Sequence, residues 1–94
     1  MIHVLVRFTV EDLEKWKTVF QEAASLRKSF GSMGVRGFSQ TGNSNEVVIL
    51  GEYADKEKAM QMFQSQEFRE ATQRAGVQGP PEVTFLDKVV ELDA

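Results

Sequence analysis

The chain has 94 residues, no cysteine and a formal net charge of −3. This length predicts one domain over residues 1–94 and excludes separate cofactor and substrate modules. Without cysteine there are no disulfides, thiolate metal sites or iron–sulfur clusters, and the acidic balance argues against nucleic-acid binding. We find neither a membrane-spanning apolar stretch nor an export signal, so the sequence predicts a soluble, cytoplasmic protein that does not bind membranes.

The first half of the predicted order is a strand followed by a helix. Residues 2–8 alternate with period two, which is typical of a strand. Apolar residues then recur at helical intervals over residues 10–30, which predicts one long helix. Thr9 is the predicted N-cap, with Asp12 three residues later in an approximate capping box. Gly31 and Gly34 follow the helix, and either suits the left-handed conformation at its end.

A hairpin and a second helical region come next. Residues 35–41 and 46–53 are predicted strands, joined by a turn over residues 42–45, Gly-Asn-Ser-Asn. Residues 55–76 carry apolar side chains at helical spacing, which predicts a long helix that is bent or broken near Ser65.

The C-terminal part combines a rigid connector with a last strand. Residues 76–81 hold two glycines and two prolines, which predicts a connector without regular structure. Residues 82–92 are the predicted fourth strand. Asp87 falls on its helix-facing side, which indicates a bulge there. Gly51, inside the third strand, marks either a bulge or a point of close approach.

The order β-α-β-β-α-β predicts an α+β protein of the ferredoxin-like class. Its four-stranded antiparallel sheet has strand order 4-1-3-2, with two helices on one face. The opposite face carries seven large apolar residues: Leu5, Phe38, Val48, Leu50, Leu86, Val90 and Leu92. Together they would expose several hundred Å², so we expect a second copy to cover them. The predicted partner is therefore this same chain, in a homodimer through the open sheet face.

Three stretches carry a family resemblance over nearly the whole chain. They are residues 6–16, residues 51–55 and residues 75–81. In this pattern the chain resembles the dimeric α/β-barrel superfamily. That group includes antibiotic-biosynthesis-monooxygenase-like proteins, stress-responsive barrel proteins and heme-degrading monooxygenases. The resemblance implies two sheets paired in a barrel. The heme-degrading relatives hold heme through a histidine on the second helical region, and residues 56–75 contain none.

His3 is the only histidine, which limits the catalytic chemistry. One imidazole without thiols cannot build the usual zinc site, and no Gly-x-Ser-x-Gly elbow supplies a triad serine. Antiparallel pairing of the first and third strands brings His3 toward Glu52 and Arg7 toward Glu46. His3, Glu52 and Arg7 are therefore the candidate catalytic residues, with imidazole and carboxylate as an acid–base pair. Alternatively, these are cross-strand ion pairs at the dimer seam.

Five large side chains could border a pocket between the helices and the sheet: Trp16, Tyr53, Met62, Phe63 and Phe68. The resemblance implies a cavity of this kind, which the monooxygenase-like relatives use for aromatic polyketides without metal or flavin. We accordingly expect no metal and no cofactor here. The alternative is that these side chains are simply core, because a domain this small needs most of its large residues for stability.

The sequence leaves two functions open. One is a small homodimeric barrel that binds an apolar or aromatic molecule and acts as a cofactor-independent monooxygenase-like enzyme. The other is a non-catalytic homodimer that binds a ligand or serves a stress-related structural role. A cavity of a few hundred Å³ touching Tyr53 or Trp16 would favour the first, and a solid core would favour the second.

Overall fold

The computed structural model describes residues 1–94 and contains four strands and four helices. In chain order these are β1 (Ile2–Val10), α1 (Leu13–Glu22), α2 (Ala24–Ser29), β2 (Ser32–Gln40), β3 (Asn43–Tyr53), α3 (Lys56–Gln64), α4 (Gln66–Arg74) and β4 (Val77–Leu86). The longest helix, α1, has ten residues, and none of the four could span a bilayer.

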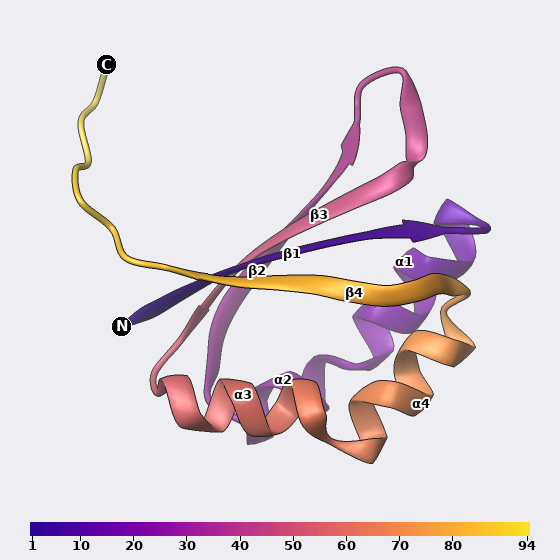
Figure 1. The fold of residues 1–94 in the computed structure, drawn as a ribbon, viewed down its shortest axis with the longest axis horizontal. Coiled ribbons are helices and arrows are strands. Elements are labelled where there is room, and N and C mark those ends of the chain that lie inside the picture. Colours follow the sequence, from indigo (N-terminus) through magenta and orange to yellow (C-terminus); the bar gives the residue numbers. More distant parts are fainter.

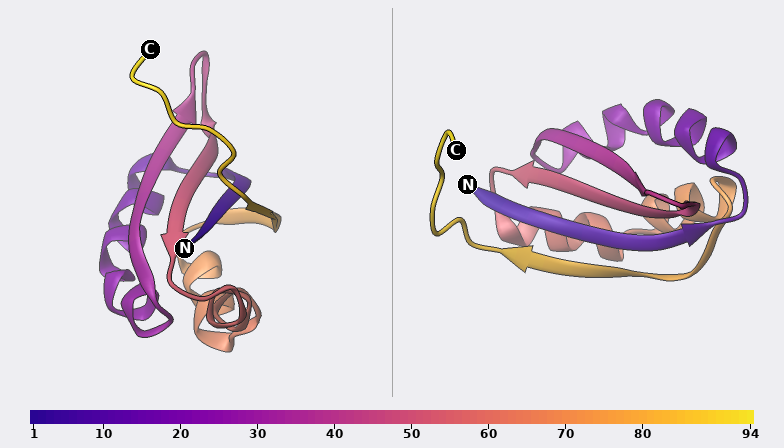
Figure 2. Two further views of the ribbon diagram at one scale, coloured as in Figure 1. Left: turned by 90° about the vertical axis from the view of Figure 1, so that its left-hand side faces the viewer. Right: turned by 90° about the horizontal axis from the view of Figure 1, so that it is seen from above.

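The strands form one antiparallel sheet in the order β2-β3-β1-β4, which is the predicted order read from the other edge. The helices pack on one face of the twisted sheet, and no element of the chain covers the other face (Figures 1 and 2). The predicted α+β, ferredoxin-like class is therefore confirmed.

The first helical region differs from the prediction at its N-terminal end and in the middle. Strand β1 continues to Val10, which is fully buried, so Thr9 belongs to the sheet and cannot cap a helix. The N-cap is instead Asp12, whose carboxylate accepts hydrogen bonds from the backbone N–H groups of Glu14 and Lys15. The helix is also divided at Ala23, into α1 and α2. The predicted left-handed Gly31 is confirmed, with φ of 87°.

The second helical region is broken at Ser65, as predicted. Ser65 has extended dihedrals (φ −74°, ψ 154°), and its Oγ accepts a hydrogen bond of 3.1 Å from the backbone N–H of Phe68. The serine therefore ends α3 and caps α4. Across this break the rings of Phe63 and Phe68 pack edge to face, with their centroids 5.2 Å apart.

The β2–β3 hairpin turns more tightly than predicted, because Gln40 already pairs with Asn43. Gly42 in this turn has φ of 88°. At Gly51, where a bulge or the close approach of a helix or ligand was predicted, a Cβ would lie 3.2 Å from the side chains of Tyr53 and Val35, so the close neighbours belong to the sheet itself. Pairing between β1 and β3 runs through Gly51 without a bulge.

The predicted connector over residues 76–81 was wrong, because β4 already begins at Val77. Residues at the start of β4 pair with the end of β1, and pairing then shifts between Gln78 and Glu82. The stretch Gly79–Pro81 is thus extra backbone inside the strand. Two prolines are tolerated here because β4 is an edge strand, where missing N–H donors cost no ladder bond.

The predicted last strand over residues 82–92 also ends too late, since β4 stops at Leu86. Leu86 pairs with His3, close to the beginning of β1, so later residues have no strand beside them. Asp87 lies beyond the strand, so its position does not require a bulge. The irregularity that was predicted in the last strand occurs instead between Gln78 and Glu82. Residues 87–94 run away from the sheet (Figures 1 and 2), and Val89, Val90 and Leu92 are exposed.

The core lies between the sheet and the helices. Its buried residues are Val4, Val6, Phe8, Val10, Trp16, Val47, Ile49, Tyr53, Ala59, Met62 and Ala75. On the opposite face the pairing sets Leu5 beside Leu50 and Phe38 beside Val48. Phe38, Leu50 and Leu86 are exposed, so the open face of a single chain carries apolar residues, as predicted. Val90 and Leu92, which were predicted on this face, lie beyond the end of β4 and are not part of the sheet.

Candidate functional site

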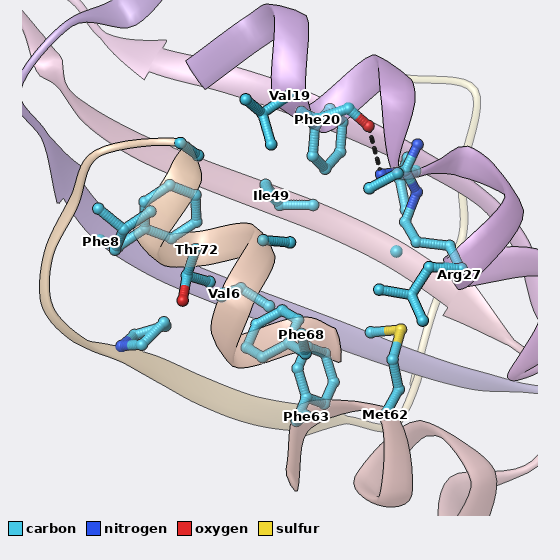
Figure 3. A pocket seen from close by; sticks show the side chains of 18 of the residues that line it. Val6, Phe8, Val19, Phe20, Arg27, Ile49, Met62, Phe63, Phe68 and Thr72 are labelled. Carbon is cyan, nitrogen blue, oxygen red and sulfur yellow. Dashed lines mark hydrogen bonds between the residues drawn. The ribbon is translucent and has the colours of Figure 1, made fainter. Parts of the chain in front are cut away.

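A cavity of about 80 Å³ lies inside this core and is partly open to solvent. Of its 21 lining residues, 17 are hydrophobic. Figure 3 shows Phe20 and Arg27 from α1 and α2 on one side, and Met62, Phe63 and Phe68 from α3 and α4 on the other. The lining includes the five residues that the sequence suggests for a pocket: Trp16, Tyr53, Met62, Phe63 and Phe68.

Trp16 is held rigidly at the wall of this cavity. Its ring stacks on Phe20 with centroids 4.8 Å apart and meets Phe8 at 5.7 Å. A Cβ at Gly37 would lie 3.2 Å from the indole, so the glycine makes room for the ring against β2. Trp16 is 6% exposed. Its side chain therefore belongs to the core and to the cavity wall at once.

Tyr53 provides a buried hydroxyl at the cavity. It comes from the last residue of β3 and is 3% exposed. Its hydroxyl donates to the sulfur of Met62 at 3.7 Å, and a thioether is a weak acceptor. Burial raises the pKa of Tyr53 above the usual tyrosine value, and the charge of Arg27 partly offsets this shift. The phenol thus stays protonated and can donate to a better acceptor.

Arg27 is the charged residue at the cavity, and it was not among the site residues predicted from the sequence. Its Nη1 donates to the backbone carbonyl of Phe20 at 2.7 Å, and its guanidinium lies 4.1 Å from the centre of the Phe20 ring. It forms no ion pair with any carboxylate. Burial lowers the pKa of Arg27, while the interaction with Tyr53 raises it. A guanidinium nevertheless stays charged near neutral pH.

A sequence signal for Arg27 did exist. It follows Phe20 and Ala23 at intervals of seven and four residues, which puts it on the apolar stripe of the predicted helix. An arginine on that stripe is unusual, because charged residues normally occupy the solvent face. However, Arg27 also lies in the last turn of the predicted helix, where a basic residue is favoured by the helix dipole. Its presence there could therefore be explained without a cavity.

Replacing Tyr53 with phenylalanine should make the protein less sensitive to alkaline pH. A tyrosine whose pKa is raised by folding stabilises the folded state below its unfolded-state pKa of about 10. That contribution is lost as the pH rises through the folded-state pKa. The free energy of unfolding, measured by urea denaturation between pH 8 and 11, should therefore fall more steeply in the wild type than in Tyr53→Phe. Parallel curves would contradict the raised pKa.

The three candidate catalytic residues lie away from this cavity, on the open face of the sheet. His3 and Glu52 are register partners, with Nδ1 and Oε1 3.9 Å apart. They border a surface depression together with residues of β2 and the start of the C-terminal segment. Arg7 lies four residues along β1, about 13 Å from His3. The structure therefore brings His3 and Glu52 together but not Arg7.

The predicted pairing of Arg7 with Glu46 was wrong. Arg7 is opposite Val48, and Glu46 is opposite Thr9, whose hydroxyl donates to the Glu46 carboxylate at 2.5 Å. In a regular antiparallel pair the two residue numbers have a constant sum. A register that joins His3 to Glu52 therefore cannot also join Arg7 to Glu46. No three His, Asp or Glu side chains converge in a way that could hold a metal ion.

Comparison with known proteins identifies the fold. No family model and no curated protein sequence matches the chain. Among solved structures, a putative antibiotic biosynthesis monooxygenase from Bordetella bronchiseptica superposes with a TM-score of 0.81 at 18% identity, over 95% of this chain and 97% of that one. SnoaB, a cofactor-independent oxygenase from Streptomyces nogalater, superposes with a TM-score of 0.80 at 14% identity, over 99% of this chain and 97% of that one. A putative antibiotic biosynthesis monooxygenase from Caulobacter crescentus superposes with a TM-score of 0.73 at 19% identity, over 95% of this chain and 90% of that one.

These similarities define the class of fold. The chain has the fold of the antibiotic-biosynthesis-monooxygenase-like proteins, over essentially the full length of each compared structure. The resemblance drawn from the sequence is thereby confirmed at the level of the fold.

Proposed function

We propose that this protein is a homodimer that binds a small aromatic molecule in the cavity and oxygenates it without a cofactor. The observation that carries the proposal is an apolar cavity with a phenol donor, Tyr53, and a cation, Arg27, in a fold shared with a cofactor-independent oxygenase. A substrate that forms a stabilised carbanion can itself supply the electrons that dioxygen needs. The protein would bind the substrate, favour its deprotonated form by charge and exclude water.

Size limits the substrate. The cavity of about 80 Å³ is smaller than the roughly 150 Å³ cavity that admits benzene in another protein. A ring therefore enters only if the cavity widens. The sheet forms one wall of the cavity, and the helical part of the lining comes from two helical pairs, α1–α2 and α3–α4, which stand on opposite sides of the cavity (Figure 3). Separation of these pairs would enlarge the space without disturbing the sheet.

Anthrone, a tricyclic ketone with an acidic methylene, provides the test of oxygenation. The expected reaction converts the methylene to a carbonyl: anthrone and O2 give anthraquinone and water, with one oxygen atom in each product. Purified protein treated with a chelator should accelerate O2 uptake over buffer by at least about tenfold. With ¹⁸O2 the new carbonyl should carry one ¹⁸O atom. Arg27→Met should lower the rate, because the carbanion loses its cationic neighbour.

A second candidate function is favoured by the small size of the cavity and by the position of His3 and Glu52 outside it. On this reading the homodimer binds a ligand or has a stress-related structural role and catalyses nothing. O2 uptake equal to that of buffer, together with a tight dimer in solution, would support this alternative. It would contradict the oxygenase proposal.

A further inference from the structure

Arg27 presents a positive charge to an apolar cavity, and no carboxylate of the chain neutralises it. The guanidinium has five N–H donors, and the structure shows one of them in a hydrogen bond, to the carbonyl of Phe20. Its Cζ lies over the Phe20 ring, 4.1 Å from the ring centroid, so a second contact restricts the guanidinium. The remaining donors are held in place by these two contacts. Partial burial of a cation without a counterion is costly, and an anion bound beside it would offset that cost.

A second donor lies at the same cavity. The Tyr53 hydroxyl has only the Met62 sulfur as acceptor, so a ligand oxygen would replace a weak hydrogen bond with a strong one. The rest of the lining is almost entirely apolar, and no Asp or Glu contributes to it. The combination of two donors, no competing anion and an apolar wall matches a small organic molecule with an anionic oxygen at one end.

We propose that the cavity binds a small apolar acid in its ionised form, a carboxylate or an acidic phenolate, with the charged oxygen held by Arg27 and Tyr53. The apolar body of the ligand lies among Met62, Phe63 and Phe68. This inference deepens the proposed function, because it names the chemical class of ligand for the same cavity. It requires binding only, so it does not depend on turnover.

Benzoate and benzamide form the matched pair of probes, since the two are nearly isosteric and differ in charge. Titration followed by ¹⁵N–¹H NMR of the full-length protein should show benzoate binding about 10- to 100-fold more tightly than benzamide. The shifted amides should be those of α2, α3 and the end of β3. Arg27→Met should abolish the preference for benzoate, and Tyr53→Phe should reduce it by a smaller factor.

Lys28→Met is the matched control. It removes one positive charge from the same turn of the same helix, but its side chain is exposed and does not line the cavity. This variant should keep the preference of the wild type. Arg27→Lys, which keeps the charge but loses the planar fork, should retain part of it. Thermal unfolding of each variant shows which ones are folded. If Arg27→Met does not fold, Arg27→Lys still allows the test to be made.

The outcomes are distinct from those of the oxygenation test. Benzoate preference without O2 uptake supports this inference and contradicts the oxygenase. O2 uptake with anthrone but equal affinity for benzoate and benzamide contradicts this inference alone. Lack of binding by both probes at millimolar concentration also overturns it. So does a preference for benzoate that Lys28→Met removes and Arg27→Met leaves intact.

Discussion

Replacing Leu50 with glutamate should convert the proposed dimer into a monomer. Leu50 is 40% exposed at the centre of the uncovered sheet face, with Leu5 opposite it in β1 and Arg36 opposite it in β2. A two-fold interface contains every residue twice. Only about 40% of each leucine side chain is left for a partner to cover, so losing the burial of two costs about 1–2.5 kcal/mol, at 1.5–3 kcal/mol for a fully buried side chain. Bringing two carboxylates into the interface adds to this cost. The dimer dissociation constant should therefore rise at least about 10-fold, as measured by analytical ultracentrifugation.

Met60→Glu gives the matched control for this experiment. Met60 is 39% exposed, almost the same as Leu50, but it belongs to α3 and not to the sheet. The same new charge on this residue should leave the sedimentation coefficient of the wild type unchanged. A wild-type protein that sediments as a monomer at micromolar concentration would contradict the homodimer directly. Loss of the dimer in both variants would show that added charge, and not the sheet face, is responsible.

The sequence predicts the sheet well because its alternation is strong where the strands are buried on one face. Val4, Val6 and Phe8 define the register of β1, and a shift by one residue would expose all three. The errors occur where tertiary contacts override local signals. Gly79–Pro81 looked incompatible with a strand, yet the edge of the sheet tolerates these residues. Residues after Leu86 alternate like a strand but have no neighbouring strand to pair with.

The candidate site is less predictable than the fold, because it depends on which side of the sheet each side chain occupies. Aromatic and thioether side chains at helical spacing were sufficient to suggest a cavity lining. Alternation also placed His3 and Arg7 on the opposite face, but their chemistry made them attractive as catalytic residues. Arg27 was missed because a basic residue in a last helical turn has an ordinary explanation. Only the packing shows that its guanidinium lies over Phe20 and faces the cavity.

Replacing Trp16 with alanine should lower the free energy of unfolding by about 3–5 kcal/mol. The indole is buried between Phe8 and Phe20 and fills the space above Gly37, so its removal leaves a void that these neighbours cannot close. For a domain of this size the loss corresponds to a fall in Tm of more than about 10 °C. Urea denaturation should be followed by circular dichroism, because Trp16 is the only tryptophan and the variant has no indole fluorescence.

Trp16→Phe is the control, because it keeps an aromatic ring at this position but removes the indole. A phenyl ring keeps part of the stack on Phe20, so this variant should lose clearly less stability than Trp16→Ala. A loss of less than about 1 kcal/mol in the free energy of unfolding for Trp16→Ala would mean that the indole is loosely packed and contributes little to the core. The expected large cost has a consequence for the cavity. If Trp16 is fixed by packing, the space for a ligand must come from separation of α1–α2 from α3–α4, and not from rotation of the indole.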